Sequence, residues 1–268
     1  MLADVARMIV PDSVRSRVGC WAMLKAAQRD SWFKRYMKVV HGYDSYALKL
    51  LPNNEAGYRF GGSSIVFPRD GIGSCFEVFD ERVYDRVNPV RHGDVVVDVG
   101  AYVGMFAIKV AHVASMVLAI EPNRDNANYI INNLVTSGIH NVQVVQQAVA
   151  DRCGTGALHL HHMSSCHSLV YGGRSSTTVM VNTLDNICSE ESRIGLVKID
   201  AEGSELAVIR GGKDTLQRAR SVVVAMYHQK EGNNGVAQVA FALGDLGFTV
   251  KVEKGLRTYL YGKHYAMV

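Results

Sequence analysis

The feature that most constrains the fold is the stretch DVVVDVGAYVGMFAIKVAHVASMVLAIEPN. It opens with a valine-rich apolar run, residues 94–99, which is typical of a parallel strand buried on both faces. A turn with glycines follows at residues 100–104, and residues 105–112 have the apolar spacing of a helix. A second buried strand, residues 116–120, ends on the acidic Glu121. A β–loop–α–β unit with a carboxylate at the tip of its second strand is the layout that binds an adenosine.

Two glycines and one carboxylate in this unit have separate physical roles. Gly100 lets the chain turn sharply out of the first strand, and Gly104 lets the start of the helix approach the sheet. Glu121, 23 residues after Asp98, can accept two hydrogen bonds from ribose hydroxyls. A dinucleotide loop, GxGxxG, would need a glycine where Tyr102 stands, because a pyrophosphate lies close against the backbone. The loop therefore favours an adenosine ligand without phosphates, namely S-adenosylmethionine, although a fold with a vacant ligand site would show the same glycines.

Length and composition set the outer bounds. The chain has 268 residues, of which 48% are hydrophobic, enough for one α/β domain of roughly 180 residues with an N-terminal extension. The formal net charge of +4 is too small to indicate nucleic-acid binding by itself. No apolar run approaches the length of a transmembrane helix, and no signal peptide is expected. The five cysteines are scattered, which indicates neither a disulfide framework nor a zinc site and favours a reducing cytoplasm.

The N-terminal part is expected to form an extension that leads into the core. Residues 13–40 predict one or two helices rich in basic and aromatic side chains. Such helices either make peripheral contact with a membrane or pack on the main domain. A β-hairpin with a glycine turn is predicted at residues 56–71, followed by a helix at residues 76–87. A helix placed before the first core strand often covers the ligand pocket, so Tyr84 is a candidate on the substrate side.

The segment after the second strand adds a candidate adenine site. Gly138 marks the end of a helix, and the third strand follows it. The turn at the end of that strand, residues 146–151, lies beside the adenine in a nucleotide fold. Ala148 and Val149 could flank the ring and Asp151 could bind its amine, or the turn is an ordinary strand exit.

Residues 152–182 are expected to be irregular, with a mobile loop that could close over a substrate. They contain four histidines. Alternation along a strand would send these side chains to different faces, and no ligand pair has CxxC or HxxxH spacing. No metal is therefore expected here.

Two later strands end on polar groups. Residues 194–200 predict a buried strand that ends on Asp200, and Glu202 follows at the edge where parallel sheets bind ligands. Residues 221–226 predict another strand, which leads to His228. Asp200 and His228 are alternative candidate bases, His228 because its pKa lies near neutral pH. Acids at this position could also cap the helix that follows, a role we assign to Glu205. A hydrogen bond to a neighbouring loop would explain His228 equally well.

Five sequence blocks occur in a family-like order: DVGAYVG, EPNRDN, QQAVAD, NTLDNI and KIDAEGSELAVIRGG. Over residues 56–262 the chain resembles the FkbM-type family of S-adenosylmethionine-dependent methyltransferases. The resemblance implies O-methylation of hydroxyls on sugars and secondary metabolites. It places the glycine loop on the methionine part of the cofactor, Glu121 on the ribose and the 146–151 turn on the adenine. The implied cofactor-binding residues are Asp98, Gly100, Ala101, Tyr102, Gly104, Glu121, Pro122, Asn123, Ala148, Val149 and Asp200, and the candidate catalytic residues are Asp200, Glu202 and His228.

The expected fold class is α/β, a class I methyltransferase Rossmann-like doubly wound sheet. The sheet should be mostly parallel with an antiparallel C-terminal edge strand, because residues 248–252 and 258–261 predict a hairpin. The expected domains are an N-terminal helical extension (1–55), a hairpin and helix leading into the core (56–92), and the S-adenosylmethionine-binding domain (93–268).

The predicted function is transfer of a methyl group from S-adenosylmethionine to a hydroxyl of a sugar, a glycan or lipid, or a secondary metabolite. The expected partner is a small-molecule or glycan acceptor, with no nucleic acid and no bound metal. Two alternatives stay open: an NAD-type oxidoreductase, which the missing middle glycine disfavours, and a nucleotide-binding protein of the same fold without turnover. The sequence indicates neither the acceptor nor the oligomeric state.

Overall fold

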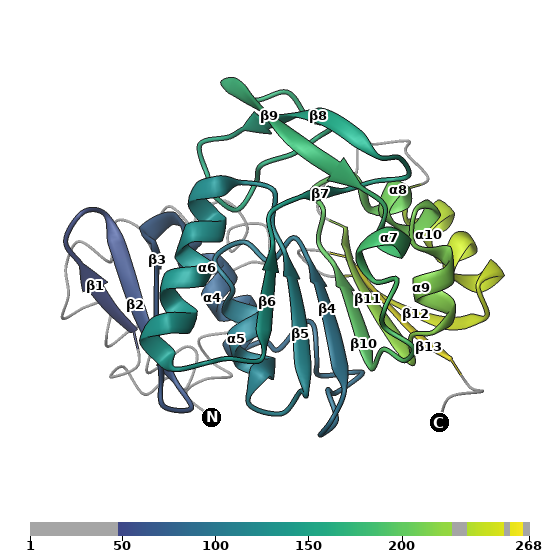
Figure 1. The fold of residues 1–268 in the computed structure, drawn as a ribbon, viewed down its shortest axis with the longest axis horizontal. Coiled ribbons are helices and arrows are strands. Elements are labelled where there is room, and N and C mark those ends of the chain that lie inside the picture. The colour runs from purple at the N-terminus through teal and green to yellow at the C-terminus, as the bar shows by residue number, and fades with distance from the viewer. Residues whose placement is uncertain (1–47, 227–234, 255–257, 265–268) are drawn as a thin grey trace, which may run out of the picture.

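A seven-stranded sheet organises the chain, whose computed structural model describes residues 48–226, 235–254 and 258–264 (Figure 1). The strand order is β12-β13-β11-β10-β4-β5-β6. All neighbouring pairs from β11 to β6 are parallel, and β13 is antiparallel to both β11 and β12. The hairpin predicted at the C-terminal edge is thus confirmed, with β12 as its outermost strand. The bounds are β4 Val95–Val99, β5 Met116–Ile120, β6 Val142–Val145, β10 Leu196–Ile199, β11 Ser221–Met226, β12 Phe248–Lys254 and β13 Thr258–His264.

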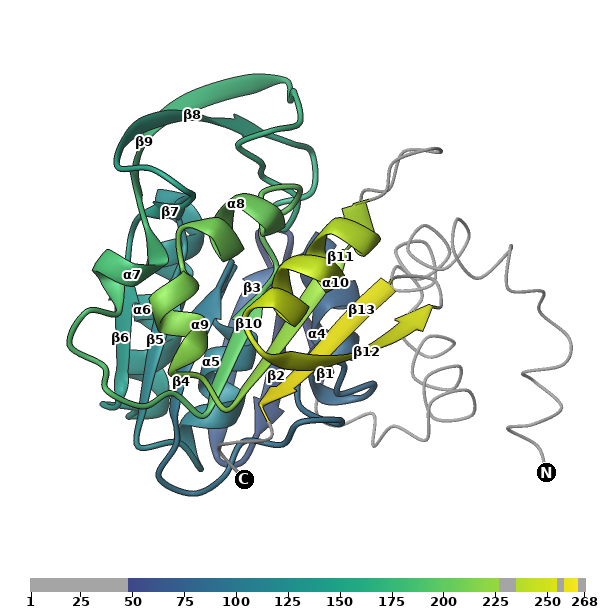
Figure 2. The ribbon, with the colours of Figure 1, turned by 90° about the vertical axis from the view of Figure 1, so that its right-hand side faces the viewer.

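Helices cover both faces of this sheet, as the expected doubly wound fold requires (Figures 1 and 2). Side chains that alternate along each strand divide between two hydrophobic clusters; in β4, Val96 belongs to one and Val97 to the other. This alternation explains why the strands read as continuous apolar runs. One face packs on α4 (Ile72–Phe79), α5 (Met105–Ala111) and α6 (Arg124–Ser137), and the other on α7 (Leu184–Ile187), α8 (Glu205–Arg210), α9 (Lys213–Gln217) and α10 (Gly235–Asp245).

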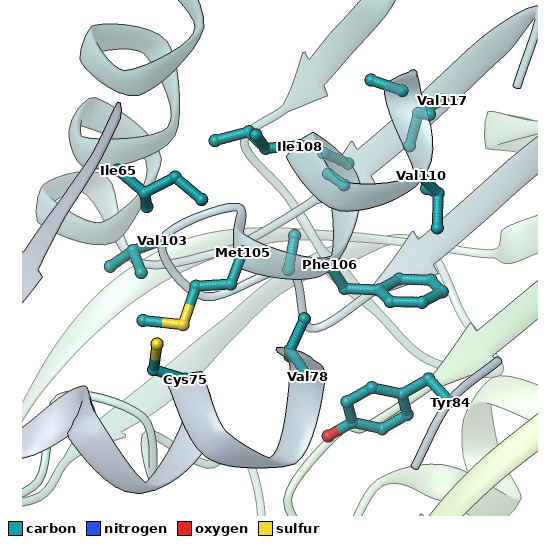
Figure 3. Packing of buried hydrophobic residues seen from close by; sticks show 14 of the residues in the cluster. Ile65, Cys75, Val78, Tyr84, Val103, Met105, Phe106, Ile108, Val110 and Val117 are labelled. Carbon is teal, nitrogen blue, oxygen red and sulfur yellow. The ribbon is translucent and has the colours of Figure 1, made fainter. Parts of the chain in front are cut away.

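On the sheet face that contains Val96, α4 and α5 pack against one another. Figure 3 shows the sulfur atoms of Cys75 and Met105 turned toward each other between the two helices. The Phe106 ring meets the Tyr84 ring edge-on, with 5.4 Å between the ring centroids. This packing fixes the helix that follows the glycine loop.

A separate three-stranded sheet, β1-β2-β3, lies beside α6. Its strands are β1 (Leu48–Leu51), β2 (Glu55–Phe60) and β3 (Ser63–Pro68), followed by the short helix η1 (Arg69–Gly71). The β2–β3 hairpin and its glycine turn confirm the prediction for this region. Asn133 of α6 pairs with the backbone of Val66 through bonds of 2.8 and 2.9 Å, which anchors the sheet.

The helical extension expected over residues 1–55 is wrong in its last part, because β1 is a strand. The helices predicted within residues 13–40, and with them the proposed membrane contact, lie outside the described residues. No helix in the part of the chain that the structure describes is long and apolar enough to cross a membrane.

The helix predicted at residues 76–87 is also wrong in its bounds, since α4 begins at Ile72 and ends at Phe79. Arg82 then has a left-handed backbone with φ of 50°, which breaks the helical path. Val83 and Tyr84 are nevertheless buried, so their apolar spacing reflects burial in a turn rather than a helix.

The prediction that residues 152–182 are irregular is wrong. They form β8 (Gly154–Leu160) and β9 (Ser175–Asn182), which pair antiparallel, and β9 also pairs in parallel with β7 (Ala148–Val149). Most side chains of β9 are exposed, so no apolar alternation marks the strand in the sequence. Both views show this small sheet standing over the carboxyl ends of the central parallel strands (Figures 1 and 2).

Candidate functional site

A cavity of about 430 Å³ opens at the carboxyl ends of β4, β5 and β10, beneath the loop that joins β8 to β9. Open parallel sheets bind their ligands at this edge. The sequence-predicted residues that line the cavity are Tyr84, Gly100, Ala101, Tyr102, Glu121, Pro122, Ala148, Val149, Asp200 and Glu202. Other lining residues are Asp70, Ser74, Glu77, Asn126, Gln147, Met163, Ser164, Cys166, His167, Lys198 and Ser204.

The glycine loop is held by close backbone contacts. Gly100 has φ of 75°, and a Cβ there would lie 1.9 Å from the carbonyl oxygen of Asp200. The amides of Gly100 and Ala101 both donate to the carbonyl oxygen of Ile120, at 3.0 Å each. A side chain at position 100 would therefore collide with the backbone that directly follows β10, so the sharp turn requires glycine.

Gly104 serves packing rather than the cavity. Its φ is 83°, and a Cβ would lie 3.0 Å from Cγ2 of Ile130 on α6. It is not among the residues that line the cavity. Gly104 thus brings the start of α5 against α6, a role toward the neighbouring helix instead of the sheet.

Glu121 lies at the tip of β5 and is 5% exposed. Its Oε2 accepts a hydrogen bond from the amide of Tyr102 at 2.9 Å, and its Oε1 accepts from the amide of Asn123 at 2.9 Å. Burial raises the pKa of Glu121 to about 7, against the opposing effect of these hydrogen bonds. The carboxylate is therefore held rigidly at the cavity wall, turned inward rather than into bulk water.

Asn123 does not line the cavity. Its side-chain oxygen accepts a hydrogen bond from the amide of Asn126 at 3.0 Å, which caps the N-terminus of α6. Its contribution to the site is indirect, because its own amide holds Glu121.

Asp98 also lies behind the cavity wall. It is fully buried and forms an ion pair with Lys198, with 2.7 Å between Oδ1 and Nζ. Lys198 lines the cavity and donates a second hydrogen bond to the carbonyl oxygen of Gly100 at 2.8 Å. Sequence reasoning missed this lysine. A charged residue inside the apolar strand GLVKID was the signal that could have found it, since an unpaired buried lysine is costly.

Asp200 follows β10 and meets Tyr84 across the cavity edge. The Tyr84 hydroxyl donates to Oδ2 of Asp200 at 2.7 Å. Oδ1 is shielded from water and has no hydrogen-bond partner among the described residues. Burial raises the pKa of Asp200 well above its ordinary value; Lys198 opposes this shift and Glu202 adds to it. Such a carboxyl titrates nearer neutral pH, as a general base requires.

Glu202 lines the cavity from the turn after β10 and has a left-handed backbone with φ of 46°. Tyr102, in the glycine loop, has the same unusual conformation with φ of 55°. Non-glycine residues in this region are strained, and such residues concentrate at functional sites. Both lie within the wall of the same cavity.

The cavity wall that the sequence predicts to flank an adenine is partly as expected. Ala148 and Val149 line it, and Gln147 joins them. Asp151 is exposed and lies outside the lining, so the expectation that it reaches the same ligand is wrong. Gln147, with an amide side chain, is the polar group that the structure brings to this wall.

The loop between β8 and β9 is tied down at Ser164. Its amide and hydroxyl donate to the two carboxylate oxygens of Asp70, at 2.7 and 2.9 Å. The Tyr102 hydroxyl lies 2.6 Å from the Ser164 hydroxyl, and Asn126 donates to the Ser164 carbonyl oxygen at 3.0 Å. The loop expected to be mobile is thus fastened over the cavity by three separate elements.

Two further predictions concern His228 as a base and the absence of a bound metal. His228 lies outside the described residues. Among the residues that are described, no group of three or more histidine, cysteine or acidic side chains is arranged to hold a metal ion.

These observations fit S-adenosylmethionine. The cavity volume falls within the range of small-molecule sites, its floor carries the buried carboxylate of Glu121, and Ala148 and Val149 supply apolar walls for a ring. The loop does not suit a pyrophosphate, because Tyr102 stands where a dinucleotide loop has its middle glycine.

Comparisons with known proteins point to one family. Residues 98–250 match the family model of the methyltransferase FkbM domain. The chain is 30% identical over 215 residues to 31-O-demethyl-FK506 methyltransferase FkbM of Streptomyces tacrolimicus, covering 66% of this chain and 82% of that protein. It is 27% identical over 210 residues to Methyltransferase 1 of Beauveria bassiana (strain ARSEF 2860), covering 66% and 81%.

Solved structures show weaker similarity. Precorrin-6y C5,15-methyltransferase from Geobacter metallireducens GS-15 has a TM-score of 0.43 and 14% identity, covering 66% of this chain and 82% of that chain. TYW2 of M. jannaschii in complex with AdoMet has a TM-score of 0.42 and 13% identity, covering 80% and 87%.

Proposed function

The chain belongs to the FkbM family of methyltransferases, whose cofactor is S-adenosylmethionine, and on this premise we propose that it methylates a hydroxyl oxygen of a small molecule. The family match spans residues 98–250 and includes the glycine loop, Glu121 and Asp200. Support for an oxygen acceptor comes from the relative of Streptomyces tacrolimicus, which is named for an O-methylation. A sugar, a glycan or lipid, or a secondary metabolite would each offer such a hydroxyl.

One observation carries the proposal: a buried carboxyl group with a raised pKa stands at the cavity wall with one oxygen unengaged among the described residues. This group is Asp200, whose Oδ2 is held by Tyr84 and whose Oδ1 has no hydrogen-bond partner there. An alcohol is a weak nucleophile and needs a base as the new bond forms. The carboxylate of Asp200, which lines the cavity, supplies a base that can accept the hydroxyl proton.

Bound S-adenosylmethionine supplies a methyl group activated by a positively charged sulfur. The work of the protein is mainly positioning, which can contribute about 7–11 kcal/mol. Glu121 would hold the ribose hydroxyls, and Ala148 and Val149 would flank the adenine. The loop fastened at Ser164 would cover the same space. Glu202 adds negative charge near the reacting face, which suits a cationic cofactor.

Several further points stay part of the proposal. Residues 93–268 would form the methyltransferase domain, and residues 56–92 would supply the wall on the acceptor side. His228 is the alternative base, and the acceptor would be a small molecule or glycan. A cytoplasmic location, which the scattered cysteines favour, is tested by cell fractionation.

The test is transfer of a labelled methyl group from S-adenosylmethionine to a cell extract and to a panel of sugars and hydroxylated macrolides. Mass spectrometry and NMR of the product locate the methyl group. We expect an O-methyl product and a fall of about 10²–10⁴-fold in rate for Asp200→Asn. Asp151→Asn, which removes an exposed carboxylate outside the cavity, is the control. A methyl group on nitrogen or carbon, or full activity of Asp200→Asn, would overturn the proposal.

A further inference from the structure

Tyr84 reaches the site from outside the part of the chain that matches the family model. It lies in the segment after α4, whereas the match begins at residue 98. The left-handed backbone of Arg82 turns the chain inward there, and Tyr84 is buried, with 4% of its surface exposed. Its hydroxyl donates to Oδ2 of Asp200, a residue 116 positions away, at 2.7 Å. Two distant segments therefore meet at the candidate base.

We propose that Tyr84 is a positioning residue that holds Oδ2 of the Asp200 carboxylate and so fixes the orientation of this carboxylate as the base for the acceptor hydroxyl. The inference rests on the proposed role of Asp200 as the base. In the step concerned, the O–H bond of the acceptor breaks and its proton passes to the Asp200 carboxylate. Oδ1 is buried and has no hydrogen-bond partner among the described residues, so the bond from Tyr84 is what orients the carboxylate there.

The ring of Tyr84 is fixed independently of its hydroxyl. It meets the Phe106 ring edge-on at 5.4 Å and the Tyr259 ring edge-on at 6.2 Å. The ammonium of Lys198 lies 4.9 Å from the Tyr84 ring centroid, within the range of a cation–π interaction. Figure 3 shows the ring at the margin of the apolar cluster, with its oxygen turned away from Phe106. A phenylalanine at position 84 would keep these ring contacts and lose only the hydroxyl.

The effect of the Tyr84 hydroxyl can be measured through the pKa of Asp200. Burial is the largest influence on the pKa of Asp200 and raises it, whereas Lys198 and the hydrogen bond from Tyr84 lower it. Because Tyr84 stabilises the ionised carboxylate, removal of its hydroxyl should raise this pKa. Among the described residues, the titratable and charged groups that act on Asp200 are Lys198, Glu202, Tyr84 and Glu205, with Cys166 from the loop between β8 and β9.

The first test follows the titration of Asp200 in the full-length protein. Aspartate is labelled with ¹³C, and the Asp200 signal is identified by its loss in Asp200→Asn. We expect the Tyr84→Phe midpoint to lie about one pH unit higher than that of the wild type, because a hydrogen bond to a charged group is lost. Tyr129→Phe is a matched control, since it removes another 2.7 Å tyrosine–carboxylate bond, to Glu55, outside the cavity. An unchanged midpoint in Tyr84→Phe would overturn the inference.

The second test measures catalysis with the acceptor found by the labelling experiment. We expect Tyr84→Phe to lower kcat about tenfold and to move the acidic limb of the kcat/KM profile upward in pH, with affinity for S-adenosylhomocysteine unchanged within about twofold. Full activity of Asp200→Asn would refute the proposed base. A strong loss in Asp200→Asn without any shift of the acidic limb in Tyr84→Phe would refute the role of Tyr84 alone.

Discussion

Lys198 of β10 and Asp98 of β4 stand at paired register positions of two neighbouring parallel strands and form a buried ion pair. The distance between Nζ and Oδ1 is 2.7 Å, and the second oxygen of Asp98 has no hydrogen-bond partner among the described residues. Lys198 also binds the carbonyl oxygen of Gly100. The pair therefore joins the two central strands directly beneath the cofactor loop.

Removal of the lysine alone should be strongly destabilising. Lys198→Met leaves Asp98 buried without its counter-ion, which we expect to lower the free energy of unfolding by about 3–5 kcal/mol. The double variant Lys198→Met with Asp98→Leu should recover most of this loss, because no buried charge remains. Urea unfolding measures both. Equal losses in the single and double variants would show that the pair itself, rather than the unpaired charge, supplies the stability.

Gly100 should tolerate no side chain. In Gly100→Ala the new Cβ would lie 1.9 Å from the Asp200 carbonyl oxygen, so the loop or β10 must move. Gly93→Ala is a matched control: φ at Gly93 is 83°, but no atom lies within 4 Å of the new Cβ. We expect a loss of about 1 kcal/mol at position 93 from backbone strain and a loss of several times that at position 100. Similar losses at the two sites would contradict the close approach.

Glu121 should set affinity for the cofactor. Glu121→Ala removes an acceptor for the ribose hydroxyls, and we expect the binding free energy of S-adenosylhomocysteine to weaken by about 1–3 kcal/mol. Isothermal titration calorimetry gives the value directly. The control Asp125→Ala removes an exposed carboxylate four residues along the chain. If Glu121→Ala bound as tightly as the wild type, Glu121 would have no place in the site.

The buried carboxyl of Asp200 should make stability depend on pH. Because burial raises its pKa above that of the unfolded chain, the folded state binds this proton more tightly. The resulting stabilisation is present below the unfolded pKa and is lost as pH rises through the folded value. We expect the Tm of Asp200→Asn to exceed that of the wild type by a margin that grows by several degrees from about pH 4 to about pH 8. A margin that stayed constant over this range would indicate an unshifted carboxyl.

A thermal-shift comparison separates the cofactor classes. S-adenosylhomocysteine at a hundred times its Kd should stabilise the fold by about 2.7 kcal/mol. NAD should give no shift, because the loop has Tyr102 where a dinucleotide loop has the glycine that lets a pyrophosphate lie against the backbone. Stabilisation by NAD alone would favour the oxidoreductase alternative.

Local sequence signals were sufficient for the central unit. The predicted strands at residues 116–120 and 221–226 have the same bounds as β5 and β11, and Gly138 ends α6 in the left-handed conformation. Strands buried on both faces are continuous apolar runs, and glycine alone adopts positive φ without strain, so both features are visible in a single sequence. Glu121 could be placed for the same reason, because it directly follows a recognisable strand.

Elements without an apolar pattern could not be found in this way. The β8–β9 hairpin pairs through its backbone while most β9 side chains stay exposed, so its sequence reads as irregular. The end of α4 depends on the turn at Arg82, which no nearby glycine or proline marks.

The sequence by itself determined the doubly wound sheet, the glycine turn and the carboxylate at the tip of β5, since each depends on residues close together in the chain. Only the tertiary structure decided three contacts. Lys198 binds the glycine loop at Gly100, Ser164 fastens the β8–β9 loop to Asp70, and Tyr84 holds Asp200. Those contacts join residues 94 to 116 positions apart. They arise from the packing of whole elements, which no short stretch of sequence encodes.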